Sequence, residues 1–224
     1  IKDIQLKEQK MFTDMLAHEL KNPLASICFT VDTLEIYADT NQKNRLERIT
    51  RAVSSIDSIV KLCVLSDRID NNKLTLVLSS FEPINTCKQV ISSFDVNRVH
   101  LRNNTASTTS VESDQELLKV IITNLLKNAL IHSPSKGSVE VRYSEYVNEI
   151  EIVFTNQIRS KQTLDLNNIF EKYSQGDSQN NSNGNGLGLY IVKSLAEKLC
   201  IDLEVSANNG VFSIKLKIPR SLPS

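Results

Sequence analysis

The chain of 224 residues has no tryptophan, only 6 glycines and 5 prolines, and no excess charge of either sign. Lys and Arg together number 26, and so do Asp and Glu, so no basic surface indicates a nucleic acid as partner. No apolar run is long enough for a transmembrane helix, and no signal peptide opens the sequence. These absences favour a cytoplasmic globular protein whose partners bind local surface patches.

The four cysteines, Cys28, Cys63, Cys87 and Cys200, are far apart and form no CxxC pair. Their spacing argues against a metal cluster and against a disulfide framework, and it indicates reduced thiols. The sequence starts at Ile1 without a methionine, inside a charged helical pattern. We therefore expect a fragment of a longer protein, and any membrane span or sensing domain N-terminal to Ile1 would lie outside these residues.

Residues 2–70 contain no glycine and a single proline, Pro23, and they carry apolar residues at intervals of three and four. This spacing predicts two amphipathic helices separated by the turn-forming segment 37–44. The first stripe comprises Phe12, Leu16, Leu20, Leu24, Ile27, Val31 and Leu34, and the second comprises Leu46, Ile49, Val53, Ile56, Val60 and Cys63. A lone hairpin leaves half of each stripe exposed, so we expect two copies to pair as a homodimeric four-helix bundle.

His18 falls between two members of the first stripe, Leu16 and Leu20. At about 100° per residue it lies roughly 160° from each of them, which predicts an exposed side chain. Pro23, about one turn later, is expected to bend the helix. An exposed histidine beside Glu19 suggests a nucleophile, although a surface histidine without a role fits the same pattern.

After residue 73 the pattern changes to strand-like runs that alternate with helical ones. The strand-like runs are 73–80, 138–146, 148–156, 202–207 and 211–219, with a hairpin turn expected at 148–150, and the helical runs are 83–94, 114–131 and 187–199. This order predicts an α/β sandwich, a mixed sheet covered by helices on one face. The predicted fold class is α+β, with a helical domain at 1–72 and a sandwich domain at 73–224.

Two features of the second domain suggest phosphate chemistry. Gly184, Gly186 and Gly188 directly precede an amphipathic helix, whose N-terminal N–H groups attract an anion. Asn124 and Asn128 lie one turn apart on a helix, and an amide oxygen suits Mg²⁺; two solvated asparagines are the simpler alternative. The polar run at 174–186 reads as a mobile lid.

Four segments, in order, resemble the sequence boxes of sensor histidine kinases. "HELKNP" (18–23) resembles the phosphoacceptor box, "NLLKNALIHS" (124–133) the N box, "IFEKYSQGD" (169–177) the F box and "GNGLGLYIVK" (184–193) the second glycine box. The resemblance covers nearly the whole chain. It implies a dimerisation and histidine phosphotransfer domain followed by a catalytic ATP-binding domain of the Bergerat (GHKL) type.

The resemblance implies that His18 is phosphorylated from Mg·ATP and passes its phosphoryl group to an aspartate on a response regulator receiver domain. A neutral imidazole is a good nucleophile near neutral pH. Glu19 would orient the imidazole or accept its proton. Asn22 resembles the position that orients water for dephosphorylation of the regulator, which predicts a phosphatase activity as well.

The implied cofactor site holds ATP and Mg²⁺. By similarity Asn128 binds Mg²⁺, Asn124 lies near the phosphates, and Asn156 meets the adenine. The glycine box would cradle the triphosphate with Gly184, Gly186, Leu187, Gly188 and Leu189.

The first glycine box departs from the family pattern of Asp-x-Gly-x-Gly. Asn156 replaces the aspartate and Ile158 a glycine, while Lys127 and Ile131 are unusual in the N box. Three alternatives follow: a kinase with weaker adenine contacts, a degenerate catalytic domain that serves as a regulator phosphatase or phosphotransfer scaffold, and a non-enzymatic dimeric module. His100 and His132 are interpreted as structural, because neither has metal-ligating neighbours.

Overall fold

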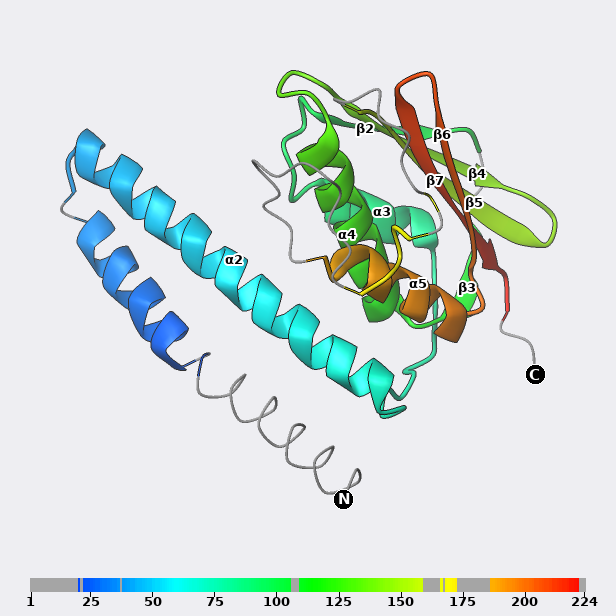
Figure 1. The fold of residues 1–224 in the computed structure, drawn as a ribbon, viewed down its shortest axis with the longest axis horizontal. Coiled ribbons are helices and arrows are strands. Elements are labelled where there is room, and N and C mark those ends of the chain that lie inside the picture. The colour runs from blue at the N-terminus through cyan, green and yellow to red at the C-terminus, as the bar shows by residue number, and fades with distance from the viewer. Residues whose placement is uncertain are drawn as a thin grey trace. The chain divides into compact units, whose positions relative to one another are not determined.

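The computed structural model describes residues 20, 22–36, 38–105, 109–158, 166, 168–172 and 186–221. His18, Glu19, Gly184 and most of the predicted lid lie outside these residues. The chain divides into two compact units, Ile1–Leu74 and Thr75–Ser224. Each unit has its own architecture (Figure 1).

The first unit contains two helices, formed by residues 22–35 and by α2 (Thr40–Asp70). A capping box starts α2: Asp39 Oδ1 accepts from the Gln42 N–H, and Gln42 Oε1 accepts from the Asp39 N–H, each at 2.8 Å. At the other end Asn72 has a left-handed φ of 52°, and the Lys73 N–H returns to the Arg68 carbonyl at 2.8 Å. The helix therefore starts and stops on side-chain and backbone signals local to the sequence.

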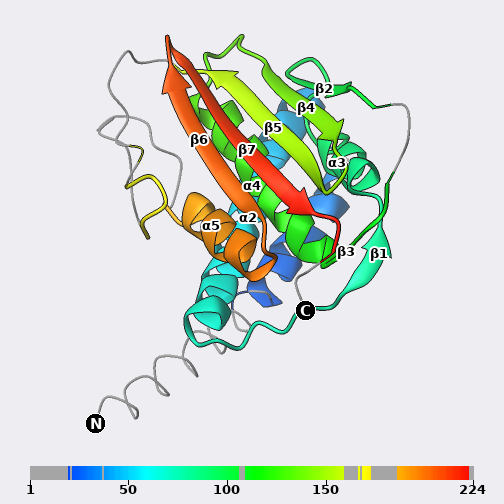
Figure 2. The ribbon, with the colours of Figure 1, turned by 90° about the vertical axis from the view of Figure 1, so that its right-hand side faces the viewer.

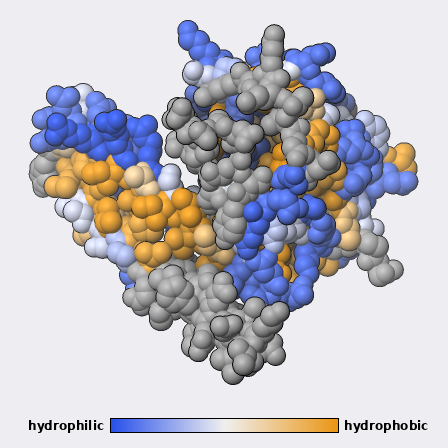
Figure 3. Space-filling model, in the orientation of Figure 1, coloured by the Kyte–Doolittle hydropathy of each residue, from blue (hydrophilic) through white to orange (hydrophobic). Residues whose placement is uncertain are grey.

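The predicted helical stripes separate into buried and exposed members. Leu24, Val31, Leu46, Val53 and Val60 are buried, each set at intervals of seven residues. The remaining described members of the stripes stay exposed at the same interval: Leu20, Ile27, Leu34, Ile49, Ile56 and Cys63. Figure 3 shows this apolar surface along the hairpin. The hairpin covers one half of its apolar face and leaves the other half open.

The second unit has a five-stranded sheet of order β2-β4-β5-β7-β6. Its strands are β2 (Val99–Asn103), β4 (Val139–Glu145), β5 (Glu149–Gln157), β6 (Asp202–Asn208) and β7 (Val211–Pro219). Only β2 and β4 are parallel, because the chain crosses between them through α4 (Gln115–His132); the other pairs are antiparallel. Helices α3 (Pro83–Ile91), α4 and α5 (Gly188–Lys198) lie on one face of the sheet (Figure 2). The predicted mixed sheet with one covered face is confirmed.

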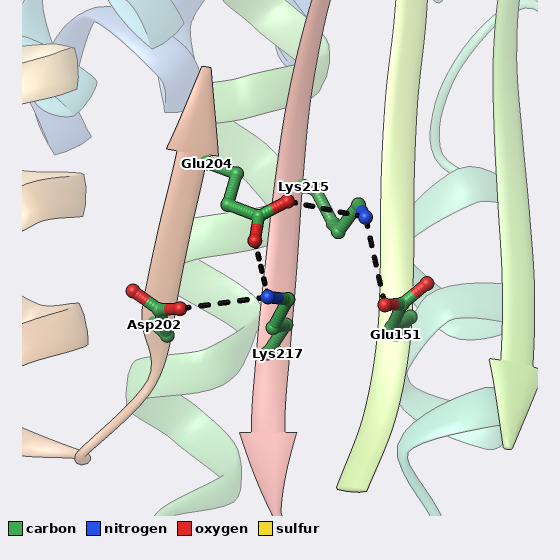
Figure 4. A network of polar contacts seen from close by, with 5 residues as sticks. All are labelled: Glu151, Asp202, Glu204, Lys215 and Lys217. Atoms are coloured by element: carbon green, nitrogen blue, oxygen red, sulfur yellow. Dashed lines mark hydrogen bonds and ion pairs between the residues drawn. The ribbon is translucent and has the colours of Figure 1, made fainter. Parts of the chain in front are cut away.

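The two faces of the sheet differ in chemistry, as period-two strands require. Ile150, Ile152 and Phe154 of β5 face the helices and are buried. The open face instead carries a ladder of ion pairs, in which Lys215 contacts Glu151 and Glu204, and Lys217 contacts Glu204 and Asp202 (Figure 4). Opposite charges in neighbouring strands pair across this solvated face.

Several predicted elements need correction. Of the run 73–80 only Ser79 and Ser80 belong to a strand, β1 (Ser79–Phe81). This strand pairs with β3 (Val111–Ser113), which the sequence pattern missed. Part of that run is held by a side chain, because the Val77 N–H donates to Asp114. The segment 37–44 is mostly helical, since the Asp39 cap starts α2 at Thr40. The hairpin turn precedes Glu149, where the Tyr146 N–H bonds to the Glu149 carbonyl at 2.8 Å.

Candidate functional site

Helix α4 is fixed at its start by Asp114, a residue that the sequence interpretation missed. Asp114 is buried; its Oδ1 accepts from the Leu117 N–H at 3.1 Å and its Oδ2 from the Val77 N–H at 2.8 Å. One carboxylate thus caps the helix and anchors the chain segment that enters the second unit. An aspartate directly before a helical run is the available sequence signal, but its bond to Val77 leaves no mark in the sequence.

The two asparagines of α4 have different surroundings. Asn124 is only 8% exposed, and its Nδ2 donates to the Val120 carbonyl of its own helix at 2.8 Å. Asn128, one turn further on, is half-buried, while Ile131 is exposed. The alternative of two solvated asparagines on an open helix face therefore does not hold for Asn124. Asn128 is the member of the pair with access to solvent.

The second glycine box reaches α4 through the start of α5. Gly186 has a left-handed φ of 66°, Leu187 is buried, and Leu189 is half-buried. A Cβ atom on Gly188 would lie 3.3 Å from Asn124 Oδ1. The structure therefore brings the N box and the second glycine box into contact.

The first turn of α5 is suited to an anion. Leu187 occupies its N-cap position, and a leucine side chain cannot accept a hydrogen bond from the first-turn N–H groups. In contrast, Asp39 and Asp114 cap α2 and α4 with side-chain oxygens. A phosphate group can take the place of such a cap, because helix N-termini present N–H donors and positive partial charge.

Asn156 is placed on the helix-covered face of β5, in register between Val139 of β4 and Phe212 of β7. It is only 3% exposed, and its Nδ2 donates to the Gln157 carbonyl at 2.9 Å. An asparagine amide has an acceptor oxygen and a second N–H beside the one engaged here, so its chemistry allows it to accept from or donate to a ligand. This residue is the single polar member among the inward-facing residues of β5.

Other predicted residues lie apart from these contacts. Asn22 is exposed on the first helix. His100 is exposed on β2, and His132 is exposed at the end of α4. No cluster of metal-ligating His, Cys, Asp or Glu side chains occurs among the residues that the structure describes. An amide oxygen such as that of Asn128 is a suitable ligand for Mg²⁺.

Further supporting residues stabilise the sandwich away from the site. Burial raises the pKa of the Cys87 thiol to about 12, so this cysteine stays neutral and unreactive. Burial, followed by the Glu145 carboxylate, raises the pKa of Tyr143 above its usual range. Arg98 closes the loop after α4, because its guanidinium donates to the carbonyls of Leu130, Pro134 and Gly137.

Two family models match the chain. Residues 8–71 match the His Kinase A (phospho-acceptor) domain, and residues 113–222 match the Histidine kinase-, DNA gyrase B-, and HSP90-like ATPase. The first match contains His18. The second contains Asn124 and Asn128 of α4 and the second glycine box at the start of α5. The two domain types occur in the order predicted from the sequence.

Similar proteins of known class agree with these matches. The Heme sensor protein HssS of Staphylococcus saprophyticus is 26% identical over 219 residues, which cover 94% of this chain and 47% of HssS. The Sensor-like histidine kinase SenX3 of Mycobacterium tuberculosis is 25% identical over 193 residues, covering 83% of this chain and 47% of SenX3. The chain spans about half the length of these relatives. No helix among the described residues could cross a membrane.

Solved structures share the fold at low sequence identity. Histidine kinase AdeS of Acinetobacter baumannii has a TM-score of 0.59 at 18% identity, covering 91% of this chain and 98% of AdeS. Full-length ShkA, solved with AMPPNP, has a TM-score of 0.69 at 18% identity, covering 96% of this chain and 47% of ShkA. The helical hairpin followed by a GHKL sandwich is thus confirmed. With both domain models matched in order, the chain belongs to the sensor histidine kinases of two-component systems.

Proposed function

We propose that this chain is an ATP-dependent protein-histidine kinase that phosphorylates His18 and passes the phosphoryl group to an aspartate of a response regulator receiver domain. The observation that carries the proposal is the contact between the N box and the second glycine box, at Asn124 and Gly188, within an ATPase-type domain. It is supported by the phosphoacceptor match around His18. Histidine kinase ThkA, which shares the fold at 18% identity and a TM-score of 0.58, has been solved in complex with the response regulator TrrA.

The residues of the second unit fit a nucleotide with Mg²⁺. The first turn of α5 offers N–H donors without a side-chain cap, and the left-handed backbone at Gly186 turns the chain toward that terminus. Asn128 is proposed to supply an amide oxygen to Mg²⁺, and Asn156 to accept from the adenine amino group. Bound Mg²⁺ neutralises phosphate charge; the protein supplies position and orientation, which is what phosphoryl transfer chiefly requires.

His18 is proposed as the nucleophile. A ring nitrogen of the neutral imidazole attacks the γ-phosphorus, the bond from phosphorus to the β-phosphate bridging oxygen breaks, and ADP leaves. Glu19 accepts the proton that the imidazole releases. In the second transfer a carboxylate oxygen of the receiver domain displaces the imidazole from the same phosphorus. The leaving ring nitrogen takes up a proton from solvent, so neutral His18 is regenerated.

The exposed apolar stripe supports a homodimer. Leu20, Ile27, Leu34, Ile49 and Ile56 repeat every seven residues on one side of the hairpin. A second copy related by two-fold symmetry would cover the same stripe with its own, giving a four-helix bundle. We propose this dimer as the functional unit, within the cytoplasmic portion of a larger receptor.

Asn22 supports a second activity of the same site. It follows His18 by four residues in the sequence and is exposed, as a residue that acts on a docked partner must be. We propose that it orients a water molecule that dephosphorylates the receiver domain. An Asn22→Ala variant that dephosphorylates the regulator at the parental rate would remove the basis for this role.

A pulse-chase experiment tests the proposed function. The chain is labelled with γ-labelled Mg·ATP, freed of nucleotide, and mixed with candidate receiver domains. We expect the label to leave the kinase and appear as an aspartyl phosphate, while a receiver domain with the acceptor aspartate changed to alanine stays unlabelled. Label that never leaves the kinase, with every receiver domain of the source organism, would contradict transfer.

A further inference from the structure

Gly188 and Asn124 are in close contact where α5 starts against α4. A methyl group on Gly188 would lie 3.3 Å from the Asn124 Oδ1 and 4.0 Å from its Cγ, and among the described residues no other atom outside the local chain comes within 4 Å of it. The missing side chain of Gly188 therefore faces an amide of the neighbouring helix. Glycine at this position permits close approach of two helices, whatever ligand binds nearby.

Asn124 has little freedom to move away from that contact. Its Nδ2 is held by the Val120 carbonyl at 2.8 Å, and the side chain is 8% exposed. The flanking residues Ile121 and Leu125 are fully or almost fully buried. A contact of 3.3 Å is tighter than most Cβ contacts, so an added methyl group at position 188 requires this amide to shift by a few tenths of an ångström. Packed interiors resist even a one-carbon increase in volume, and the bond to Val120 opposes that shift.

We propose that Asn124 is a positioning residue, and that its packing against the bare Cα of Gly188, rather than access of phosphate to the backbone, is what requires glycine at position 188. The contact sets the spacing between α4 and the first turn of α5. Asn128 lies one turn further along α4, about 6 Å away. Asn124 therefore fixes the distance between Asn128 and the first-turn N–H groups of α5. The importance of this distance rests on the proposed function, in which Asn128 binds Mg²⁺ and the N–H groups bind phosphate.

A double-mutant cycle on the nucleotide-free chain tests the packing contact. Gly→Ala within a helix normally stabilises, yet here we expect Gly188→Ala to lower the melting temperature by about 2–8 °C, because the methyl group collides with Asn124. In the Asn124→Ala background the collision is gone, so Gly188→Ala should raise the melting temperature by about 1–3 °C. Ser194→Ala, on the half-buried side of α5, gives the propensity gain without a collision and serves as the control.

The same four proteins, measured at a temperature where all are folded, test the positioning role. We expect Gly188→Ala to weaken Mg·ATP binding about tenfold and to have less than a twofold effect in the Asn124→Ala background, a coupling that a purely structural role would not produce. A stable Gly188→Ala variant that loses the same affinity in both backgrounds would overturn the inference and return glycine 188 to a phosphate role. If no variant bound ATP, the proposed function would fail while the melting-temperature cycle still decided the packing contact.

Discussion

Replacing Ile56 on the exposed stripe of α2 should weaken the proposed homodimer. Full burial of an isoleucine side chain contributes about 1.5–3 kcal/mol. Ile56 is still 44% exposed in the single chain, so about 1 kcal/mol remains to be gained when a second copy covers it. Each copy of a two-fold symmetric dimer contributes one Ile56, so Ile56→Ala should weaken the free energy of dimerisation by about 2 kcal/mol. This corresponds to roughly a 30-fold increase in the dimer dissociation constant.

Sedimentation equilibrium over a concentration series measures that constant directly. Ile56→Asp should dissociate the dimer further, because each copy would bury an unpaired carboxylate. Ser54→Asp is the matched control, since Ser54 is exposed and lies about 160° around the same helix. The reasoning fails if Ile56→Ala leaves the dissociation constant within threefold of the parent, or if Ser54→Asp dissociates the dimer as strongly as Ile56→Asp.

Three further variants probe the second unit. Asn156→Asp should tighten ATP binding about fivefold by isothermal titration, because charge-assisted hydrogen bonds exceed neutral ones by roughly 1 kcal/mol; unchanged or weaker affinity would remove Asn156 from the adenine site. Asp114→Ala should lower the free energy of unfolding, measured in urea, by about 2–4 kcal/mol, because it removes the α4 cap and leaves the Val77 N–H unpaired. Asp114→Asn keeps an acceptor oxygen and should retain much of the parental stability. Burial raises the pKa of Cys87 from 9.0 to about 12, so with rising pH the unfolded chain loses the thiol proton before the folded chain does. The free energy of unfolding should therefore fall above pH 9 by up to about 1.4 kcal/mol per pH unit, and Cys87→Ala should reduce that slope.

The helical half was predictable because its signals are local and repetitive. Intervals of three and four residues placed both stripes, and the structure divides them into a buried set around Val53 and an exposed set around Ile56. The sequence pattern predicted too long a connection between the two helices, because Thr40 and the residues after it belong to α2, whose N-cap is Asp39. A capping box of four residues, Asp39 to Gln42, decides the local structure here against a turn-forming composition.

The sandwich was less predictable wherever a distant residue decides the structure. Residues 74–78 alternate like a strand, yet the partner of the Val77 N–H is Asp114, 37 residues away. The same holds for the site: spacing placed Asn124 and Asn128 on one helix face, but only the packing of α5 distinguishes a buried Asn124 from a half-buried Asn128. The order of the motifs in the sequence was enough to identify the boxes. The surroundings of each residue within a box depend on tertiary packing, which the sequence pattern does not show.

The central claim is that His18 receives the phosphoryl group of ATP. The direct measurement is incubation of the purified dimer with γ-labelled Mg·ATP at increasing concentration, with His18→Gln in parallel. The account predicts acid-labile, base-stable label that saturates with ATP and is absent from His18→Gln. No label at saturating ATP in a folded dimer, or equal label in the His18→Gln chain, would contradict it.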